Sequence, residues 1–375
     1  MTDGQPSIRC ITPYTANHNI LVARSAGPRA VLRRAAINRM DLSIIIINWN
    51  TKDFVRGCLA SVRAHAGAME YEVLVVDNAS YDGCEQMIKT EFPEVVFIQS
   101  DVNAGFAKAN NLAFGQSRGR CVLFLNPDTE IQEGALQRLV ASLDTIPTSG
   151  MVGARLLNSD LSLQTTCVTA LPSILNQALS SAPLREAFPR WSMWGMQPLF
   201  DEVENPVQVE AISGACMMAR RGVIEQVGGF STNYFMYSED MDLCLKVAKS
   251  GWQIYYVPAA RIVHHAGGSS SLRQESNFSS IMLRQSVLRF MELHRGKGYA
   301  TGYRYSMAFV ATCRILVLVL ALPVAALSPG QWFPSRALSK WYDILLWSFG
   351  FAQWATDQKL PARAVSQGRT APELE

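Results

Sequence analysis

The feature that most constrains this sequence is a regular alternation of apolar strands and amphipathic helices that begins at residue 41. The run Leu42–Ile47 is almost entirely apolar and rich in isoleucine, which is typical of a strand buried on both faces of a sheet. A helical pattern follows, with Val55, Leu59 and Val62 on one face. Strands separated by helices favour right-handed crossovers. We therefore expect an α/β fold with a mainly parallel sheet flanked by helices.

The same alternation continues further along the chain. Strands are predicted at 72–76, 95–98, 121–125, 209–219 and 253–257, and helices at 84–90, 106–116, 134–143 and 239–249. Residues 158–208 are less regular and rich in Ser, Pro and Trp, which indicates an insertion or a loop-rich region.

Composition excludes several classes of protein. Of the 375 residues, 49% are hydrophobic and 17% are charged, so the chain has enough apolar surface for a large core and is not disordered as a whole. The net charge is only +3, which argues against a dedicated nucleic-acid binder. The eight cysteines form no C-x-x-C pair, so we predict reduced core residues of a cytosolic protein rather than a zinc site.

The first 40 residues differ from the rest of the chain. They contain six arginines and a single acid, Asp3, and no apolar stretch of signal-peptide length. We expect a basic N-terminal extension that is disordered, or a true start at Met40, directly before the first strand.

The C-terminal part is apolar and aromatic. Residues 307–327 carry a single charge, Arg314, and residues 344–355 form a second, shorter apolar stretch. Tryptophans favour the membrane interface, and the basic residues between 284 and 304 suit an anionic leaflet. Three interpretations remain open: a helical subdomain packed on the core, a monotopic or re-entrant membrane contact, and a true span.

Polar side chains follow three of the predicted strands. They lie in Asn48–Asn50, Asp77–Ser80 and Asn126–Asp128. Ligands of parallel sheets bind beyond the carboxyl ends of the strands. An acid such as Asp128 could there reach a divalent cation that bridges a diphosphate, and Asp77 could accept hydrogen bonds from a base or ribose. The alternative is that both are ordinary turn residues.

A glycine-containing segment, Asn103–Asn111, opens a helix after a strand. Gly105 permits close backbone approach, and a helix N-terminus favours phosphate. The sequence contains no G-x-G-x-x-G and no G-x-x-x-x-G-K-[ST], which counts against an NAD enzyme and a P-loop NTPase.

Two further patterns suggest catalytic chemistry. Glu239–Asp242 places three acids in four residues at a helix start, where crowded carboxylates can act as a general base or simply form an acid-rich first turn. His264 and His265 precede two glycines after the next strand. A histidine in that position is a candidate ligand, although a single histidine is usually structural.

Taken together in order, these segments resemble the inverting family-2 glycosyltransferases with a GT-A fold. The resemblance covers residues 41–270 and is strongest to the bacterial rhamnosyltransferases, with galactofuranosyltransferases as relatives. The segments that carry it are 43–50, 77–80, 103–107, 125–129, 214–220, 239–242 and 264–269.

The resemblance implies a role for each matching residue. Asp240 would be the catalytic base, with Glu239 beside it, and Asp128 and His264 would hold Mg²⁺ or Mn²⁺. Asn126 stands where the family's D-x-D motif has its first Asp, so Asp128 would carry the ionic part of cation binding. The implied donor-binding residues are Asn48, Asp77, Asn78, Asn103, Gly105, Asn110 and Asn126.

The implied function is transfer of rhamnose from dTDP-rhamnose to a lipid-linked or cell-surface glycan, at the inner face of the cytoplasmic membrane. The alternatives are a transferase for another nucleotide sugar, such as UDP-galactofuranose, and a non-catalytic binding protein of the same fold. The expected organisation is an extension (1–40), a GT-A domain (41–275, with halves 41–150 and 151–275), a helical membrane-proximal region (276–360) and a tail (361–375).

Overall fold

The computed structural model describes residues 40–201, 204–265, 277–327 and 335–351. Residues 1–39 of the N-terminal extension, the expected domain boundary at 275 and the tail lie outside these residues, as do two tryptophans of the apolar C-terminal part, Trp332 and Trp354.

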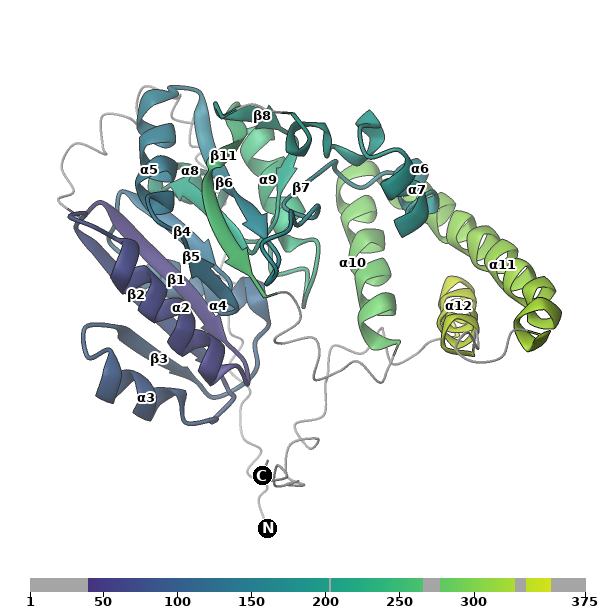
Figure 1. The fold of residues 1–375 in the computed structure, drawn as a ribbon, viewed down its shortest axis with the longest axis horizontal. Helices are drawn as coiled ribbons and strands as arrows, with labels where there is room; N and C mark the ends of the chain where they lie inside the picture. Colours follow the sequence, from purple (N-terminus) through teal and green to yellow (C-terminus); the bar gives the residue numbers. More distant parts are fainter. Residues whose placement is uncertain (1–39, 202–203, 266–276, 328–334, 352–375) are drawn as a thin grey trace, which may run out of the picture.

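A large mixed sheet forms the centre of the molecule (Figure 1). Its strand order is β3-β2-β1-β4-β10-β6-β11-β5, with β8 paired to β11. Strands β1 to β4 are parallel, whereas β10 runs antiparallel to both β4 and β6. The strands are β1 (Leu42–Asn48), β2 (Tyr71–Asn78), β3 (Val96–Ser100), β4 (Cys121–Leu125), β5 (Thr129–Ile131), β6 (Ser149–Leu157), β8 (Val207–Val209), β10 (Cys216–Arg220) and β11 (Gln253–His264), and β7 (Val168–Thr169) pairs with β9 (Ala211–Ile212) in a second sheet.

Helices cover both faces of the sheet. Helices α2, α3 and α5 pack on one face, and α4, α8 and α9 pack on the other. The helices are α2 (Lys52–His65), α3 (Cys84–Glu91), α4 (Phe106–Gln116), α5 (Ala135–Thr145), α6 (Ile174–Ala178), α7 (Ala182–Ala187), α8 (Arg221–Val227), α9 (Glu239–Lys249), α10 (Phe278–Arg295), α11 (Lys297–Leu327) and α12 (Ser335–Ser348), with 3₁₀ turns at Ser192–Trp194 and Gln197–Leu199.

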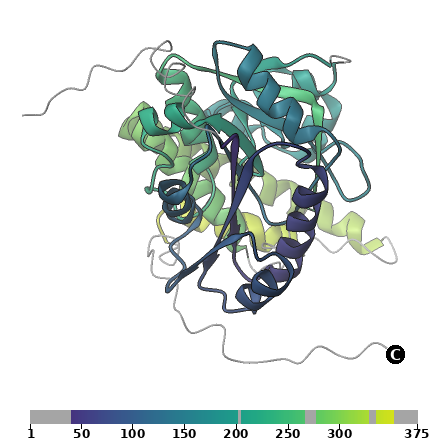
Figure 2. The same cartoon turned by 90° about the vertical axis from the view of Figure 1, so that its left-hand side faces the viewer.

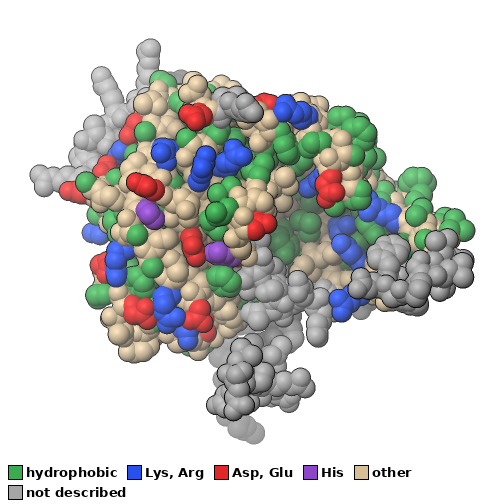
Figure 3. All heavy atoms as spheres, viewed as in Figure 1, with side chains coloured by type: hydrophobic (Ala, Val, Ile, Leu, Met, Phe, Trp, Pro, Cys, Tyr) green, Lys and Arg blue, Asp and Glu red, His purple; other side chains and the backbone are tan. Residues whose placement is uncertain are grey.

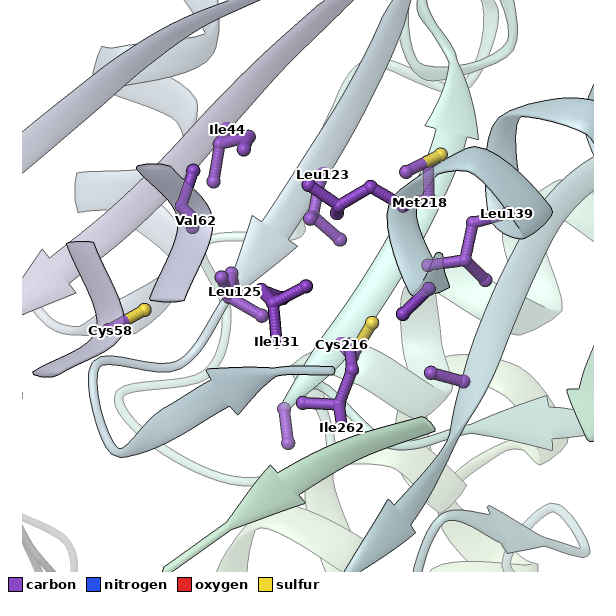
Figure 4. Close-up of a cluster of buried hydrophobic side chains, with 14 of the residues drawn as sticks. Ile44, Cys58, Val62, Leu123, Leu125, Ile131, Leu139, Cys216, Met218 and Ile262 are labelled. Atoms are coloured by element: carbon purple, nitrogen blue, oxygen red, sulfur yellow. The ribbon is translucent and has the colours of Figure 1, made fainter. Parts of the chain in front are cut away.

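Strand β1 explains why both faces must be covered. Ile44 and Ile46 belong to the core beneath α2 and α5, whereas Ile45 belongs to the core beneath α4. All three are 0% exposed. Full burial of an isoleucine side chain contributes about 1.5–3 kcal/mol, so this strand favours a two-sided α/β sheet. Figure 4 shows Ile44 and Leu123 lying with Val62 of α2 in the first of these cores.

Strand β6 was not predicted, because it contains two glycines and a charged residue. Ideal Cβ atoms at Gly150 and Gly153 would lie 2.6 Å from Trp252 Cβ and 2.8 Å from Ile212 Cβ. The glycines therefore permit close packing against this strand. Their low strand propensity alone would predict only a weak strand.

Three other expectations need correction. The predicted strand 209–219 is broken into β8, β9 and β10. Strand β11 continues past Pro258 to His264, because a register shift between Val257 and Arg261 accommodates the proline. Cys313 is exposed, whereas the other described cysteines are buried and free.

The three C-terminal helices form a third apolar cluster with the loop before α9. Helix α11 is continuous for 31 residues, and Arg314 lies within it rather than ending it. Its segment Lys297–Leu322 is long and apolar enough to cross a membrane, but only 17% of its most apolar window is buried. Figure 2 shows these helices behind the first strands of the sheet.

The close packing at β6 can be tested with a matched pair of substitutions. Gly153→Ala should lower the free energy of unfolding by about 1–3 kcal/mol, because its new methyl group overlaps Ile212. Gly115→Ala, in α4, meets no atom within 4 Å and should be neutral or stabilising. Chemical denaturation measures both, and equal stability of the two variants would contradict this account.

Candidate active site

The sheet register brings the polar strand ends to one edge. Asn48 is the parallel partner of Asp77, and Ile46 is the partner of Leu125 in β4. The loops after β1, β2 and β4 therefore begin side by side. Strands β2 and β4 flank β1 on opposite sides, so the order in which strands are added to the sheet reverses at β1. Ligands of α/β sheets bind at such a switch point.

Asp77 lies at the centre of a buried hydrogen-bond network. Its carboxylate accepts hydrogen bonds from the side chains of Asn48 (2.7 Å), Ser80 (2.5 Å) and Gln99 (2.8 Å). The backbone N–H groups of Ser80 and Tyr81 donate two more. Asp77 is 1% exposed and Asn48 is 0% exposed. Both side chains therefore fix the shape of the loops. A direct contact of either residue with a nucleotide-sugar donor stays a prediction.

The remaining predicted donor-binding residues lie next to this network. Asn78 Nδ2 donates to Asn103 Oδ1 (2.9 Å), which also accepts from the Gly105 N–H (3.1 Å). Asn110 is buried in α4 and donates to the Phe106 carbonyl, while its Oδ1 has no hydrogen-bond partner. The structure thus groups Asn78, Asn103 and Gly105, and places Asn110 beneath them in the helix.

Strand pairing brings Asp128 and His264 together, although 135 residues separate them. Antiparallel pairing of β5 and β11 sets His264 opposite Thr129. The His265 N–H donates to the Asp128 carbonyl (2.8 Å), and His264 Nε2 lies 3.3 Å from Asp128 Oδ1. The side-chain nitrogen of Asn126, Nδ2, is 3.5 Å from the same ring nitrogen. This is the predicted metal position, with its three residues adjacent.

The orientation of His264 bears on whether a cation fits. Its Nδ1 lies 2.7 Å from Gln164 Oε1, which accepts because the Gln164 amide nitrogen donates to Asn158 (3.0 Å). Nδ1 therefore donates to Gln164, and Nε2 is the ring nitrogen that faces the Asp128 carboxylate. A neutral imidazole nitrogen and a carboxylate oxygen at this distance are suitable ligands for one divalent ion, so the residues present fit such an ion.

Protein ligands alone do not complete such a site. Within the described ranges, no group of three or more His, Cys, Asp or Glu could hold a metal ion. Asp128, His264 and the amide of Asn126 would have to be joined by substrate phosphates or water, which is common for Mg²⁺.

A short backbone segment connects this position to Asp240. The Gly214 N–H donates to Asp240 Oδ2 (3.0 Å), and the carbonyl of the next residue, Ala215, accepts from the Asn126 N–H (3.0 Å). Asp240, at the start of α9, and Asp128, after β4, therefore flank the same edge of the sheet. Their convergence with Asp77 and His264 around one sugar stays a prediction.

The acids at the start of α9 have different surroundings. Asp240 is partly exposed; burial raises its pKa, while the hydrogen bonds from Gly214 and Met241 lower it. Glu239 is buried, and one of its carboxylate oxygens has no hydrogen-bond partner. Burial, and then the charge of Asp240, raise the pKa of Glu239. Asp242 points away and binds His294 (2.6 Å).

The backbone is strained around the site. Tyr237 and Ser238, directly before α9, both have positive φ angles, as do Asn50, Ala79 and Tyr81 after β1 and β2. Such residues cost of order 1–3 kcal/mol each and cluster at functional sites. Gly105 adds a close approach, because a Cβ there would lie 2.7 Å from the Phe235 carbonyl. The two halves of the sheet domain therefore meet at this edge.

Some residues of the site carried no recognisable signal in the sequence. Gln164, which orients His264, lies in the irregular region 158–208, and Gln99 reaches Asp77 from a strand interior. The Gly214 N–H belongs to a segment that supported the family resemblance, but its partner could not be inferred without the fold. His294, which binds Asp242, lies in α10.

Comparison with known proteins shows the family of the chain. Residues 43–228 match the family Glycosyl transferase family 2, and residues 162–354 match Glycosyl transferase family group 2. The chain therefore belongs to glycosyltransferase family 2.

Its relatives include rhamnosyltransferases. The chain is 29% identical over 252 residues to the N-acetylglucosaminyl-diphospho-decaprenol L-rhamnosyltransferase of Mycobacterium tuberculosis, covering 64% of this chain and 80% of the relative. It is 26% identical to the rhamnosyltransferase WbbL of Escherichia coli, covering 60% and 83%. A solved structure, the mannosyltransferase PcManGT of Pyrobaculum calidifontis in complex with GDP-Man and Mn²⁺, aligns with a TM-score of 0.47 and 17% identity over 88% of this chain and 90% of that chain.

The buried Glu239 makes stability depend on pH. Because its pKa is raised in the folded state, the folded chain holds this proton more tightly than the unfolded chain. The stability that this proton contributes is therefore lost as the pH rises above the ordinary glutamate pKa of about 4.3. Glu239→Gln should flatten the fall in unfolding free energy between about pH 5 and 8. Glu225→Gln, at an exposed position of α8, is the control, and identical pH profiles for both variants would contradict the assignment.

Proposed function

We propose that this chain is an inverting glycosyltransferase that transfers rhamnose from dTDP-rhamnose to a lipid-linked glycan acceptor. The observation that carries the proposal is the hydrogen-bonded segment Gly214–Ala215, which joins Asp240 to the loop that holds Asp128. Sugar transfer from a nucleoside diphosphate requires a base for the acceptor hydroxyl and a site that offsets the negative charge of the departing diphosphate. The two would lie on opposite sides of this segment.

Asp240 is the proposed base because it is partly exposed at the site, whereas Glu239 is buried behind it. Asp240 would remove the proton of the acceptor hydroxyl as that oxygen attacks the anomeric carbon from the face opposite the leaving group. The anomeric centre would be oxocarbenium-like, by analogy with glycoside hydrolysis. A raised pKa suits this role, since the carboxylate then takes up a proton more readily near neutral pH.

The donor half of the site would hold the nucleotide and its diphosphate. The loops fixed by Asp77 and the helix that begins after Gly105 would receive the nucleoside and phosphates. Asp128 and His264, with Asn126 beside them, would hold Mg²⁺ or Mn²⁺. When bound, that ion would offset the charge on the departing diphosphate. The choice of rhamnose rests on the names of the two relatives.

The acceptor would be presented at the inner face of the cytoplasmic membrane. The relative from M. tuberculosis is named for a diphospho-decaprenol substrate. Helix α11 exposes large apolar side chains to solvent, among them Phe309 (71%), Leu316 (57%) and Leu320 (77%). A solvent-exposed apolar face of this size marks an interaction surface. We propose peripheral contact of the 276–360 region with the membrane and retain 41–275 as the GT-A domain.

The base assignment gives the first functional prediction. Asp240→Asn should lower kcat by a factor of about 10² or more, because an amide cannot accept the proton, while donor affinity is retained. Steady-state kinetics and donor titration measure the two quantities. Asp53→Asn, at an exposed position of α2, is the control. Near-normal turnover by Asp240→Asn would remove this residue from its role.

Donor choice and metal use can be read from one assay. A panel of nucleotide sugars, with and without Mn²⁺ or Mg²⁺, should show release of dTDP from dTDP-rhamnose that EDTA abolishes and added metal restores. Preference for UDP-galactofuranose would contradict the rhamnose assignment. Donor binding without turnover, in the presence of a lipid diphosphate acceptor, would favour a non-catalytic binding protein.

The membrane contact is best tested by substitution. Truncation at Ser306 would also delete Met307 and Ala311, which are buried against the other C-terminal helices. The triple variant Phe309→Ser, Leu316→Ser, Leu320→Ser changes only exposed side chains and should abolish flotation with vesicles. Leu283→Ser with Leu293→Ser, exposed on α10, is the control. Unchanged flotation of the triple variant would end the membrane proposal.

A further inference from the structure

Three basic side chains from three different helices meet around one tryptophan. The guanidinium groups of Arg284 (α10) and Arg314 (α11) lie 5.5 and 4.4 Å from the ring centroid of Trp341 (α12). Lys340 precedes this tryptophan in the chain. We call Arg284, Arg314 and Lys340 the cation cluster. Figure 3 shows Lys and Arg side chains gathered in the recess between the main body and the C-terminal helices.

The cation cluster has no anionic partner in the described part of the chain. None of its three members lies within ion-pair distance of a carboxylate there, whereas Arg120, for comparison, pairs with both Asp41 and Asp144. Burial lowers the pKa of Lys340, and the charges of Arg284 and Arg314 lower it further. Like charges held together away from water destabilise a fold unless an anion joins them.

Unpaired hydrogen-bond donors accompany these charges. Arg284 Nε is buried without a hydrogen-bond partner, and so is the hydroxyl of Tyr303, a residue that is 0% exposed. The Arg284 charge also acts on this hydroxyl. Buried donors are nearly always paired in folded proteins. Two orphaned donors beside three cations without an anionic partner indicate a missing acceptor with negative charge.

The position of the cluster connects it to the active site and to the apolar face of α11. Ser286, two residues after Arg284 in α10, donates to the Met236 carbonyl (2.7 Å) in the loop that leads to Asp240. The cluster therefore lies across α10 from that loop, a separation on the order of one helix diameter, about 10 Å. Arg314 belongs to the same helix as the exposed Leu316 and Leu320.

We propose that the cation cluster binds the diphosphate of the lipid-linked acceptor, with the prenyl chain along α11 and the acceptor sugar toward Asp240. This assignment rests on the proposed function. Three cations suit a diphosphate better than a phosphate diester, which carries a single charge. The neighbouring apolar face of α11 suits a long hydrocarbon chain.

The first test uses inorganic diphosphate and the full chain. Diphosphate should raise the unfolding temperature of the wild type and of Arg336→Gln, an exposed position one helical turn before Lys340. It should leave Lys340→Met and Arg284→Gln unchanged. Without diphosphate, Lys340→Met should be at least as stable as the wild type, because a repelling charge is gone. A diphosphate shift that survives in both cluster variants would overturn the proposal.

The second test identifies the source of the phosphate. Binding of the full chain, without donor, is measured to neutral vesicles containing a polyprenyl diphosphate sugar and to vesicles matched in charge by phosphatidylglycerol. Each cluster substitution should weaken binding to the prenyl diphosphate about tenfold or more, with little effect on the phosphatidylglycerol arm. Equal losses in both arms would contradict the acceptor assignment in favour of a lipid headgroup.

These measurements separate the two proposals. If prenyl diphosphate binding depends on the cluster but no nucleotide sugar is turned over, the proposed function fails and the anion site stands. If rhamnose transfer proceeds while the cluster variants bind prenyl diphosphate normally, the anion site fails and the transferase stands.

Discussion

The hydrogen bond between the Asn126 N–H and the Ala215 carbonyl is the interaction on which the site depends. It fixes the end of β4 against the segment that enters β10, and the adjacent Gly214 N–H then holds Asp240. A carboxylate at the start of α9 is thereby tied to a carboxylate 112 positions earlier in the chain. This bond continues the β4–β10 ladder, which joins the two halves of the sheet, into the loop that holds Asp128.

The rest of the edge is built to hold that geometry rigid. The Asp77 carboxylate accepts hydrogen bonds from five protein donors. Positive φ angles at Ala79, Tyr237 and Ser238 set the turns of the adjoining loops. Gln164 fixes the tautomer of His264 in the same way. Much of the polar network therefore positions other residues, whereas Asp240, Asp128 and His264 are the groups that we propose to carry the chemistry.

How much of this the sequence predicted depends on how local the signal was. Helices α4 and α9 and strand β4 begin and end where their periodicity and turn residues indicated. Strand β6 was missed, because its glycines reflect the approach of Trp252 and Ile212, which are distant in sequence. The adjacency of Asp128 and His264 was inferred from a family resemblance, whereas its cause, the β5–β11 register, could not be read from residues alone. The orientation of His264 by Gln164 had no sequence signal at all.

The account is tested most directly by a crystal structure of the full chain with dTDP-rhamnose and Mn²⁺. We predict anomalous density for manganese beside Asp128 and His264, with the sugar between that ion and Asp240. A hollow of about 920 Å³, lined by Glu210, Trp252 and Arg295, lies at the end of β11 opposite His264. A nucleotide sugar bound there, with none at the edge formed by Asp128 and Asp240, would contradict the account.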